Sequence, residues 1–194
     1  MKFDSYKKYK WFFTSGKKLV VGGKSAEQND GLLNELKNDN KNYYVMHTRA
    51  PGSPFSVIVS DMKKIIKSDL DECAIFTGCF SRAWKEGKKK VEVDIFSLNQ
   101  IKKDKSMKTG TWKVSGEVKR VVVDLRLALT KQENILRAVP EKTVNKEEVL
   151  AVICPGKIDK KNMVVKIAVE INDGEISKNE ILAALPAGGV RICR

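Results

Sequence analysis

Apolar residues in the first third of the chain form short runs separated by turn residues, a pattern that predicts strands. The runs at residues 11–14 and 19–21 predict a β-hairpin, because Ser15-Gly16 lies between them. The nearly all-apolar runs at residues 43–47 and 55–59 predict two further interior strands joined by a loop. The N-terminal half of the chain is therefore expected to build a sheet.

Helical signals alternate with these strands. Ser25 and Gln28 have the spacing of a capping box, and leucines on one helical face follow, so a helix is expected to begin near Ala26. Helical spacing over residues 70–84 predicts a second helix, in which Trp84 is expected to pack rather than to bind. The next apolar runs, at residues 91–96, 112–114 and 118–124, predict more strands, and the last two are expected to pair as a hairpin.

Polar residues at 140–146 interrupt the pattern and predict a boundary. Beyond it we expect a short strand, a helix capped by Asp159 and a second helix opened by a capping box at Ser177. The predicted fold class is α+β, with a mixed, mainly antiparallel sheet, helices packed on it and a small α/β C-terminal subdomain. The expected division is a binding domain at residues 1–139 and a C-terminal extension of unknown function at residues 140–194.

Charge is unevenly distributed along the chain. The net charge is +13, and residues 1–120 carry 25 basic and 14 acidic side chains against 12 and 10 in residues 121–194. A strongly basic surface attracts phosphate backbones, so nucleic acid is the first partner to consider, with an anionic membrane second. Binding through phosphates predicts an affinity that falls as salt rises.

Cysteine and hydropathy patterns limit the other classes. The four cysteines include no C-x-x-C pair, and with a single histidine no metal site is expected; no cofactor is expected either. No apolar run approaches the length of a membrane span, and the N-terminus lacks the apolar region of a secretion signal. Together with cysteines read as free thiols, these features predict a cytoplasmic protein without a membrane partner.

Two segments are candidates for binding. Gly-Gly-Lys-Ser at residues 22–25 resembles the end of a P-loop, but Lys18 stands where that motif needs its first glycine. Free N–H groups at a helix start beside Lys24 still suit one phosphate; alternatively, the glycines serve only packing or positive φ. His47 ends a strand, and Arg49, Gly52 and Ser53 follow in its loop, so a cation, exposed backbone and a hydroxyl converge there.

Several separated motifs occur in the order typical of one family. The pattern W-F-x-S-x-x-x-L-V-V-G-G-x-x-A-x-Q-N precedes a strand ending in His47 and then Pro51-Gly52-Ser53. Cys79-Phe80-Ser81-Arg82-Ala83-Trp84 and Val91-Glu92-Val93-Asp94 follow, with Lys103 and Lys108-Thr109-Gly110 after them. Over about residues 9–120 the chain therefore resembles the NFACT RNA-binding domain family, as a small stand-alone member.

The resemblance implies an α+β module that binds structured RNA, tRNA or rRNA. In large NFACT proteins this module accompanies other domains that engage stalled large ribosomal subunits and tRNA, which implies a link to translation quality control and to the large subunit. The tail-adding activity of the large proteins is not carried over, because this chain has no room for their other domains. One position departs from the family: Tyr43 stands where an acidic residue usually lies four residues before the histidine.

Candidate site residues combine this resemblance with basic clusters on rigid elements. The predicted nucleic-acid-binding residues are Lys24, Gln28, Asn29, His47, Arg49, Gly52, Ser53, Ser81, Arg82, Lys85, Lys88, Lys89, Lys90, Lys103 and Lys108. Arg82 and Lys88–Lys90 are expected to share one face. If His47 contacts phosphate, RNA affinity should strengthen as the pH falls through about 6.5.

No catalytic residues are predicted. The nucleophile-elbow motif G-x-S-x-G does not occur, and no pair of carboxylates has a catalytic motif around it. We therefore expect a binding protein rather than an enzyme. Two alternatives stay open: a ribosome or protein interaction adaptor without specific RNA recognition, and, less favoured, an enzyme acting on nucleotides. The oligomeric state is not predicted.

Overall fold

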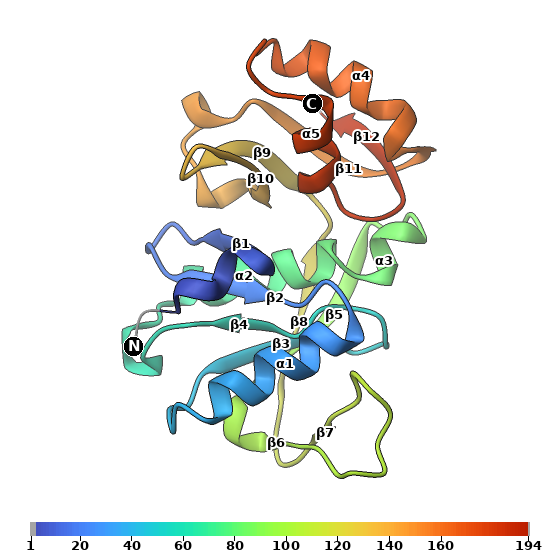
Figure 1. Ribbon diagram of the computed structural model, residues 1–194. Helices are drawn as coiled ribbons and strands as arrows, with labels where there is room; N and C mark the ends of the chain where they lie inside the picture. Colours follow the sequence, from blue (N-terminus) through green and yellow to red (C-terminus); the bar gives the residue numbers. More distant parts are fainter. Residues whose placement is uncertain (1–2, 194) are drawn as a thin grey trace.

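The structure, a computed structural model, describes residues 3–193. Its larger sheet has six strands in the order β1-β2-β4-β3-β5-β8, and every neighbouring pair is antiparallel. These strands are β1 (Lys10–Phe13), β2 (Leu19–Gly22), β3 (Tyr44–Thr48), β4 (Ser56–Ile58), β5 (Lys90–Ser97) and β8 (Lys119–Asp124) (Figure 1). The predicted hairpin and the two interior strands after it are confirmed.

One face of this sheet is covered by α1 (Ala26–Lys37). The buried side chains of this layer include Leu32, Leu33, Leu36, Val45 and Val57. The helix begins where the sequence predicts, because the Ser25 hydroxyl accepts a hydrogen bond from the Gln28 N–H. The Gln28 amide oxygen, however, accepts from the Lys24 N–H instead of reaching back to Ser25, so only half of the predicted capping box is right.

The opposite face packs on α2 (Lys67–Cys79) and α3 (Arg82–Lys85). Trp84 is fully buried and donates its indole N–H to the Gly189 carbonyl oxygen at 3.0 Å, which confirms its packing role. Short 3-10 helices complete this part of the chain at Asp4–Lys8, Met62–Lys64 and Leu98–Gln100.

A second sheet follows in the order β10-β9-β11-β12. Its strands are β9 (Leu127–Gln132), β10 (Ile135–Pro140), β11 (Ala151–Asp159) and β12 (Gly189–Cys193), with 3-10 helices at Glu141–Thr143 and Lys146–Glu148. α4 (Lys160–Ile171) and α5 (Lys178–Ala184) lie with this sheet at the top of Figure 1. Asp159 and Ser177 cap these helices as predicted, so the fold class is α+β, with antiparallel sheets and helices packed on them.

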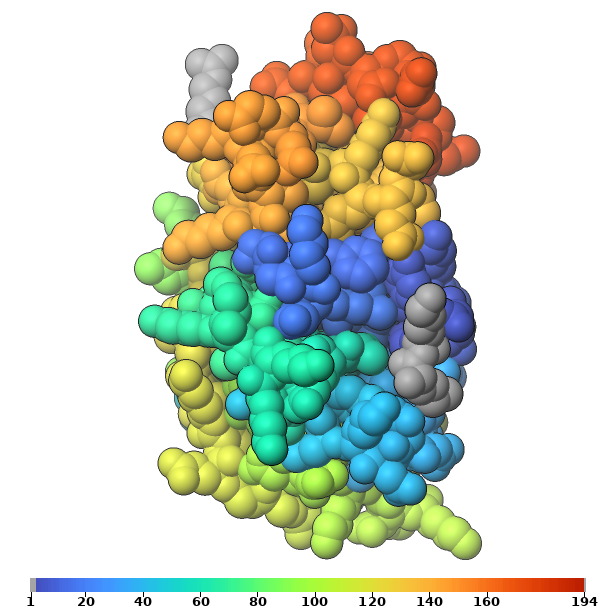
Figure 2. Space-filling view, turned by 90° about the vertical axis from the view of Figure 1, so that its left-hand side faces the viewer, coloured from blue at the N-terminus to red at the C-terminus, as the bar shows by residue number. Residues whose placement is uncertain are grey.

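The two sheets share one core. Phe12 and Phe76 from the first part and Leu127, Ile153 and Ile167 from the second belong to a single buried cluster. The Gln132 side-chain amide also exchanges two hydrogen bonds with the Phe13 backbone, at 2.8 and 2.9 Å, and so covers the free edge of β1. In Figure 2 the early residues in blue lie directly against the yellow residues of β9 and β10. The division after residue 139 stays a prediction, although β9 and β10 belong to the second sheet.

The expected hairpin of residues 112–114 with 118–124 is wrong. β7 (Lys113–Val114) pairs instead with β6 (Ile101–Lys102), and β8 pairs with β5. The physical reason is burial: β8 carries Val121 and Val123 on the face that packs against the core, and beside β5 both reach it. Pairing with the short β7 would not cover them.

Two of the four cysteines are not free thiols. Cys154 and Cys193 form a disulfide, because the antiparallel pairing of β11 with β12 brings them together with a Cα–Cα distance of 6.1 Å. Cys73 and Cys79 are free and buried, and burial raises the pKa of both thiols. The argument from free thiols for a cytosolic protein therefore rests on Cys73 and Cys79 alone. Of the helices in residues 3–193, none combines the length and apolarity needed to cross a bilayer.

Candidate functional site

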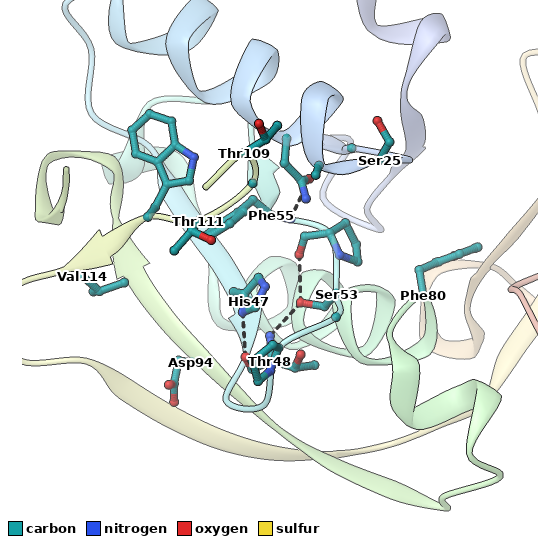
Figure 3. Close-up of a pocket in the computed structure, with 18 of the residues that line it drawn as sticks. Ser25, His47, Thr48, Ser53, Phe55, Phe80, Asp94, Thr109, Thr111 and Val114 are labelled. Atoms are coloured by element: carbon teal, nitrogen blue, oxygen red, sulfur yellow. Dashed lines mark hydrogen bonds between the residues drawn. The ribbon is translucent and has the colours of Figure 1, made fainter. Parts of the chain in front are cut away.

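A cleft of about 580 Å³ opens between the first turn of α1, the loop after β3, the end of β5 and residues 109–114. It collects chain segments that are far apart in sequence, and it contains the only histidine of the chain. Figure 3 shows His47, Ser53 and Phe55 around this space, with Ser25 on one side and Asp94 on the other. Its volume lies within the range of about 300–1,000 Å³ that is usual for ligand sites.

The α1 side of the cleft follows from close packing of the backbone. A side chain at Gly23 would overlap Asn29, so this glycine is needed for close approach and not for positive φ. Asn29 is buried and its amide oxygen accepts from the Phe55 N–H at 3.1 Å, which ties α1 to the residue before β4. Gln28 holds the backbone of Lys24 at 3.0 Å, and the Lys24 side chain is exposed. Of these three predicted site residues, only Lys24 is free to contact a ligand with its charge.

His47 lies on the cleft floor and is half-buried against Phe55, with the two ring centroids 4.5 Å apart. Its Nδ1 lies 2.7 Å from the Thr48 carbonyl oxygen, which can only accept, so neutral His47 carries its proton on Nδ1 and Nε2 is an acceptor. Burial lowers the pKa of His47, although the Thr48 and Ser53 carbonyls and Asp94 oppose this. The expected change in RNA affinity near pH 6.5 therefore moves to lower pH.

A carboxylate does accompany the histidine, although Tyr43 stands at the family's acidic position. Asp94 on β5 is the cross-strand partner of His47. Arg120 on β8 donates two hydrogen bonds to Asp94, Nε to Oδ1 at 2.6 Å and Nη2 to Oδ2 at 3.0 Å. The three strands thus carry one row of side chains: His47, Asp94 and Arg120. Both carboxylate oxygens of Asp94 already accept hydrogen bonds from the Arg120 guanidinium. Tyr43 instead donates its hydroxyl to Asp39 at 2.7 Å.

The loop after β3 is shaped by Gly52 and Ser53. Gly52 has φ +108°, and an added Cβ would lie 3.1 Å from the Cβ of Arg82, whose N–H donates to the Gly52 carbonyl at 2.7 Å. The Ser53 hydroxyl is buried, accepts from the Thr48 N–H at 2.9 Å and donates to the Pro54 carbonyl at 3.1 Å. Both residues position the loop. Arg49 is exposed at its tip and pairs with Glu92 at 3.0 Å.

The predicted basic face is only partly assembled. A shallow depression brings Lys88 and Lys90 beside Arg49, whereas Arg82 lies against Gly52 at the cleft side. Lys88 pairs with Glu86 at 2.8 Å and Lys90 with Asp124 at 3.6 Å, so Lys89 is the residue of this run without an ion pair in the described chain. Lys85 is exposed. Ser81 is buried and caps α3 by accepting from the Ala83 N–H at 3.1 Å, which is a structural role.

Asp30 organises the remaining wall of the cleft. It accepts from Lys103 Nζ at 2.7 Å, from the Gly110 N–H at 3.0 Å and from Trp112 Nε1 at 2.7 Å. Partial burial alone would raise the pKa of Asp30, but these hydrogen bonds and the Lys103 charge hold it below its usual value. Lys103 is therefore an internal partner of Asp30, while Lys108 is exposed on the same loop.

Sequence reasoning missed Asp30, Trp112, Arg120 and the role of Asp94. Asp94 lies in a recognised motif, but its pairing with Arg120 depends on the register of β5 with β8. Asp30 is one acidic residue among many, and its partners are 73 to 82 residues away in the chain. No local signal identified these contacts. Within the described residues no group of three or more metal-binding side chains is present.

Comparisons with known proteins identify a matching family and a relative. A family model described as the NFACT protein RNA binding domain matches residues 8–116, which is more than half of the chain. The archaeal Rqc2 homolog aRqcH of Methanocaldococcus jannaschii is 30% identical over 199 aligned residues, which include 97% of this chain. The chain spans 29% of the length of that relative.

A solved structure is similar in fold. It is the C-terminal part of the fibronectin/fibrinogen-binding protein from Streptococcus suis, with a TM-score of 0.50 and 24% identity. The similarity covers 58% of this chain and 44% of the other.

Proposed function

This chain belongs to the family of NFACT RNA-binding domains, and from that premise we propose that it holds an unpaired segment of a structured RNA in the cleft beside α1. Proteins read RNA mainly at single-stranded loops and ends, whose bases stack on aromatic rings and whose edges form hydrogen bonds. The observation that carries the proposal is the position of His47. It lies on Phe55 with Nε2 as an acceptor, in a cleft lined on another side by exposed Lys24.

The phosphate and the base of a bound nucleotide would contact different walls of the cleft. Lys24 suits a phosphate, and its position at the start of α1 adds to this, because a helix N-terminus favours anions. An acceptor at Nε2 suits a 2′-hydroxyl or a base N–H donor rather than a phosphate oxygen. Arg49 and the lysines of the depression next to it, Lys88 and Lys90, extend the positive surface beyond the cleft.

We propose a binding role without catalysis. The Ser53 hydroxyl is held by Thr48 and Pro54, Asp94 by Arg120, and His47 Nδ1 by Thr48, so no described serine–histidine or histidine–carboxylate pair is poised for proton transfer. We propose tRNA or rRNA on the large ribosomal subunit as the bound RNA, and a role in ribosome quality control in the cytoplasm. The similarity to an archaeal Rqc2 homolog supports this proposal.

Fluorescence anisotropy with three probes tests this function. We expect a folded tRNA to bind more tightly than a fully paired RNA duplex or heparin, because only the tRNA offers unpaired nucleotides in a fixed shape. Lys24→Gln should weaken tRNA binding, whereas Lys64→Gln, an exposed lysine outside the cleft, should not. Equal affinity for all three probes would favour an adaptor that only meets polyanions through its charge.

A further inference from the structure

Four basic side chains lie where the two sheets meet, and three of them are near enough to Lys10 for their charges to act on it. They come from different elements: Lys10 from β1, Lys24 from the turn before α1, Arg137 from β10 and Lys160 from the first turn of α4. Lys10, Arg137 and Lys160 are partly buried, and Lys24 is exposed. None of the four forms an ion pair with a carboxylate in residues 3–193, unlike many exposed lysines of this chain.

Within the described residues, Lys10 and Lys160 donate their side-chain hydrogen bonds to backbone carbonyls. Lys10 Nζ lies 3.3 Å from the Ala183 carbonyl oxygen and 4.5 Å from the centroid of the Phe80 ring. Lys160 Nζ lies 3.1 Å from the Leu182 carbonyl oxygen. Both carbonyls belong to the last turn of α5, so the two ammonium groups are fixed at one place. Each ammonium has three donors, and further donors are available for a ligand.

Arg137 is fixed by stacking rather than by charge. Its guanidinium lies 4.0 Å from the centroid of the Trp11 ring, and its buried Nε has no hydrogen-bond partner among the described residues. Glu133, an acid in its surroundings, already accepts from the Tyr6 hydroxyl at 2.6 Å and pairs with Lys7 at 3.0 Å. A buried donor without an acceptor is rare. Because this Nε is closed to solvent, an anion would reach the guanidinium through its terminal nitrogens.

Electrostatics in the cluster are unfavourable without a ligand. Burial, and then the charges of Lys160, Lys24 and Arg137, lower the pKa of Lys10 to about 8. Burial also lowers the pKa of Lys24 and of Lys160, with Arg137 adding to the first and Asp159 opposing the second. Like charges at short range raise the free energy of the folded state, and a bound anion reverses the sign of that effect.

We propose that Lys10, Lys24, Arg137 and Lys160 form a phosphate-binding site for the RNA strand that leaves the cleft. Lys24 and Phe80 line the cleft, and Phe80 also contacts Lys10, so the two sites adjoin. The proposal rests on RNA binding and extends it to Arg137 and Lys160, which lie beyond the family match at residues 8–116. The second sheet, despite its nearly balanced charge, would thus complete the RNA surface.

Two variants and a matched control test the site. Lys160→Gln removes one charge of the cluster, and Lys10→Met removes the most buried one while keeping an unbranched side chain. Lys166→Gln is the control, because Lys166 is exposed on the same helix and forms no ion pair in the described chain. With a tRNA probe, each cluster variant should lose one phosphate contact and flatten the slope of log affinity against log salt by about 0.7–0.9. The control should match the parent.

Thermal unfolding distinguishes a phosphate-binding role of Lys10 and Lys160 from a role in capping α5 alone. Lys10→Met should raise Tm in the absence of RNA, because it removes a poorly solvated charge among like charges, and should still weaken tRNA binding. If Lys10→Met lowers Tm, or if both cluster variants titrate like Lys166→Gln, these lysines only cap α5 and the proposal is wrong.

A thermal-unfolding experiment with pyrophosphate tests the anion site independently of RNA binding. Pyrophosphate should raise the Tm of the parent more than that of Lys160→Gln. If pyrophosphate raises the Tm of the parent but tRNA does not bind, the anion site is supported and the proposed function is wrong. If tRNA binds but pyrophosphate raises the Tm of both proteins equally, the proposed function is supported and the anion site is wrong.

Discussion

Replacing Asp30 by alanine should both destabilise the protein and open the cleft. The carboxylate accepts hydrogen bonds from Lys103, Gly110 and Trp112, and thereby joins α1 to the loop that forms one cleft wall. Its removal leaves the Gly110 and Trp112 N–H donors without their acceptor, and leaves the partly buried Lys103 ammonium with the Lys108 carbonyl oxygen at 3.1 Å. Loss of an acceptor costs roughly 1–3 kcal/mol for each donor left behind.

The size of the expected destabilisation depends on how exposed the side chains of Asp30 and Lys103 are. The side chains of Asp30 and Lys103 are 17% and 21% exposed, so water compensates part of the loss. We therefore take the lower end for each bond, which gives about 3 kcal/mol in total. For a chain of this length, about 2–4 °C in Tm corresponds to each kcal/mol, so we expect a decrease of about 6–12 °C.

Thermal unfolding and tryptophan fluorescence measure the two effects. The Trp112 indole loses its partner in Asp30→Ala, so the summed emission of the three tryptophans should shift to longer wavelength as the loop detaches and admits water, since Trp11 and Trp84 are buried elsewhere. tRNA affinity should fall even at temperatures where the variant is folded. Asp104→Ala is the matched control, because Asp104 is an exposed acid on the same loop and forms no ion pair in the described residues. An unchanged Tm and emission in Asp30→Ala would refute this role of the carboxylate.

Three further predictions concern the site. Because burial lowers the pKa of His47, tRNA affinity should stay nearly constant between about pH 7.5 and 6.5; a titration in anisotropy that disappears in His47→Ala would contradict this. Gly52→Ala should cost about 1–3 kcal/mol through its positive φ and weaken RNA binding by displacing Arg82, whereas Gly87→Ala, with φ +72° and open space around it, should affect stability alone. Replacing Lys88, Lys89 and Lys90 together by alanine should flatten the salt slope by less than three full contacts, because two of the lysines are ion-paired; unchanged binding would exclude this face.

Local signals explain what the sequence could predict. The β1–β2 hairpin, the start of α1 and the caps of α4 and α5 each depend on residues within about four positions, where turn and capping chemistry acts. The loop of His47 could be recognised for the same reason, since its histidine, arginine, glycine and serine lie close together in sequence.

Long-range pairing explains what could not be predicted. β7 has too few apolar residues to select a partner, and the burial of Val121 and Val123 decides where β8 goes. The Asp94–Arg120 pair, the contacts of Asp30 and the Cys154–Cys193 disulfide all join elements whose register only the folded chain sets. A residue such as Ser53 or Ser81 was recognised in the right place, but its hydroxyl serves the backbone around the site.

The shared core makes the division at residue 139 testable. Ending the chain there would keep β9 and all of β10 except Pro140, but would remove β11, β12, α4 and α5. Leu127, Leu129 and Leu136 would then lose the neighbours that bury them. Phe76 of α2 belongs to the same cluster, so the damage would reach the first sheet. We expect residues 1–139 alone to unfold at a much lower temperature than the full chain, or to associate through the exposed apolar face, and to show early protease cleavage within β9 and β10. Cooperative unfolding of this fragment near the Tm of the full chain, as a monomer by light scattering, would show instead that the first sheet and its helices are stable without the second.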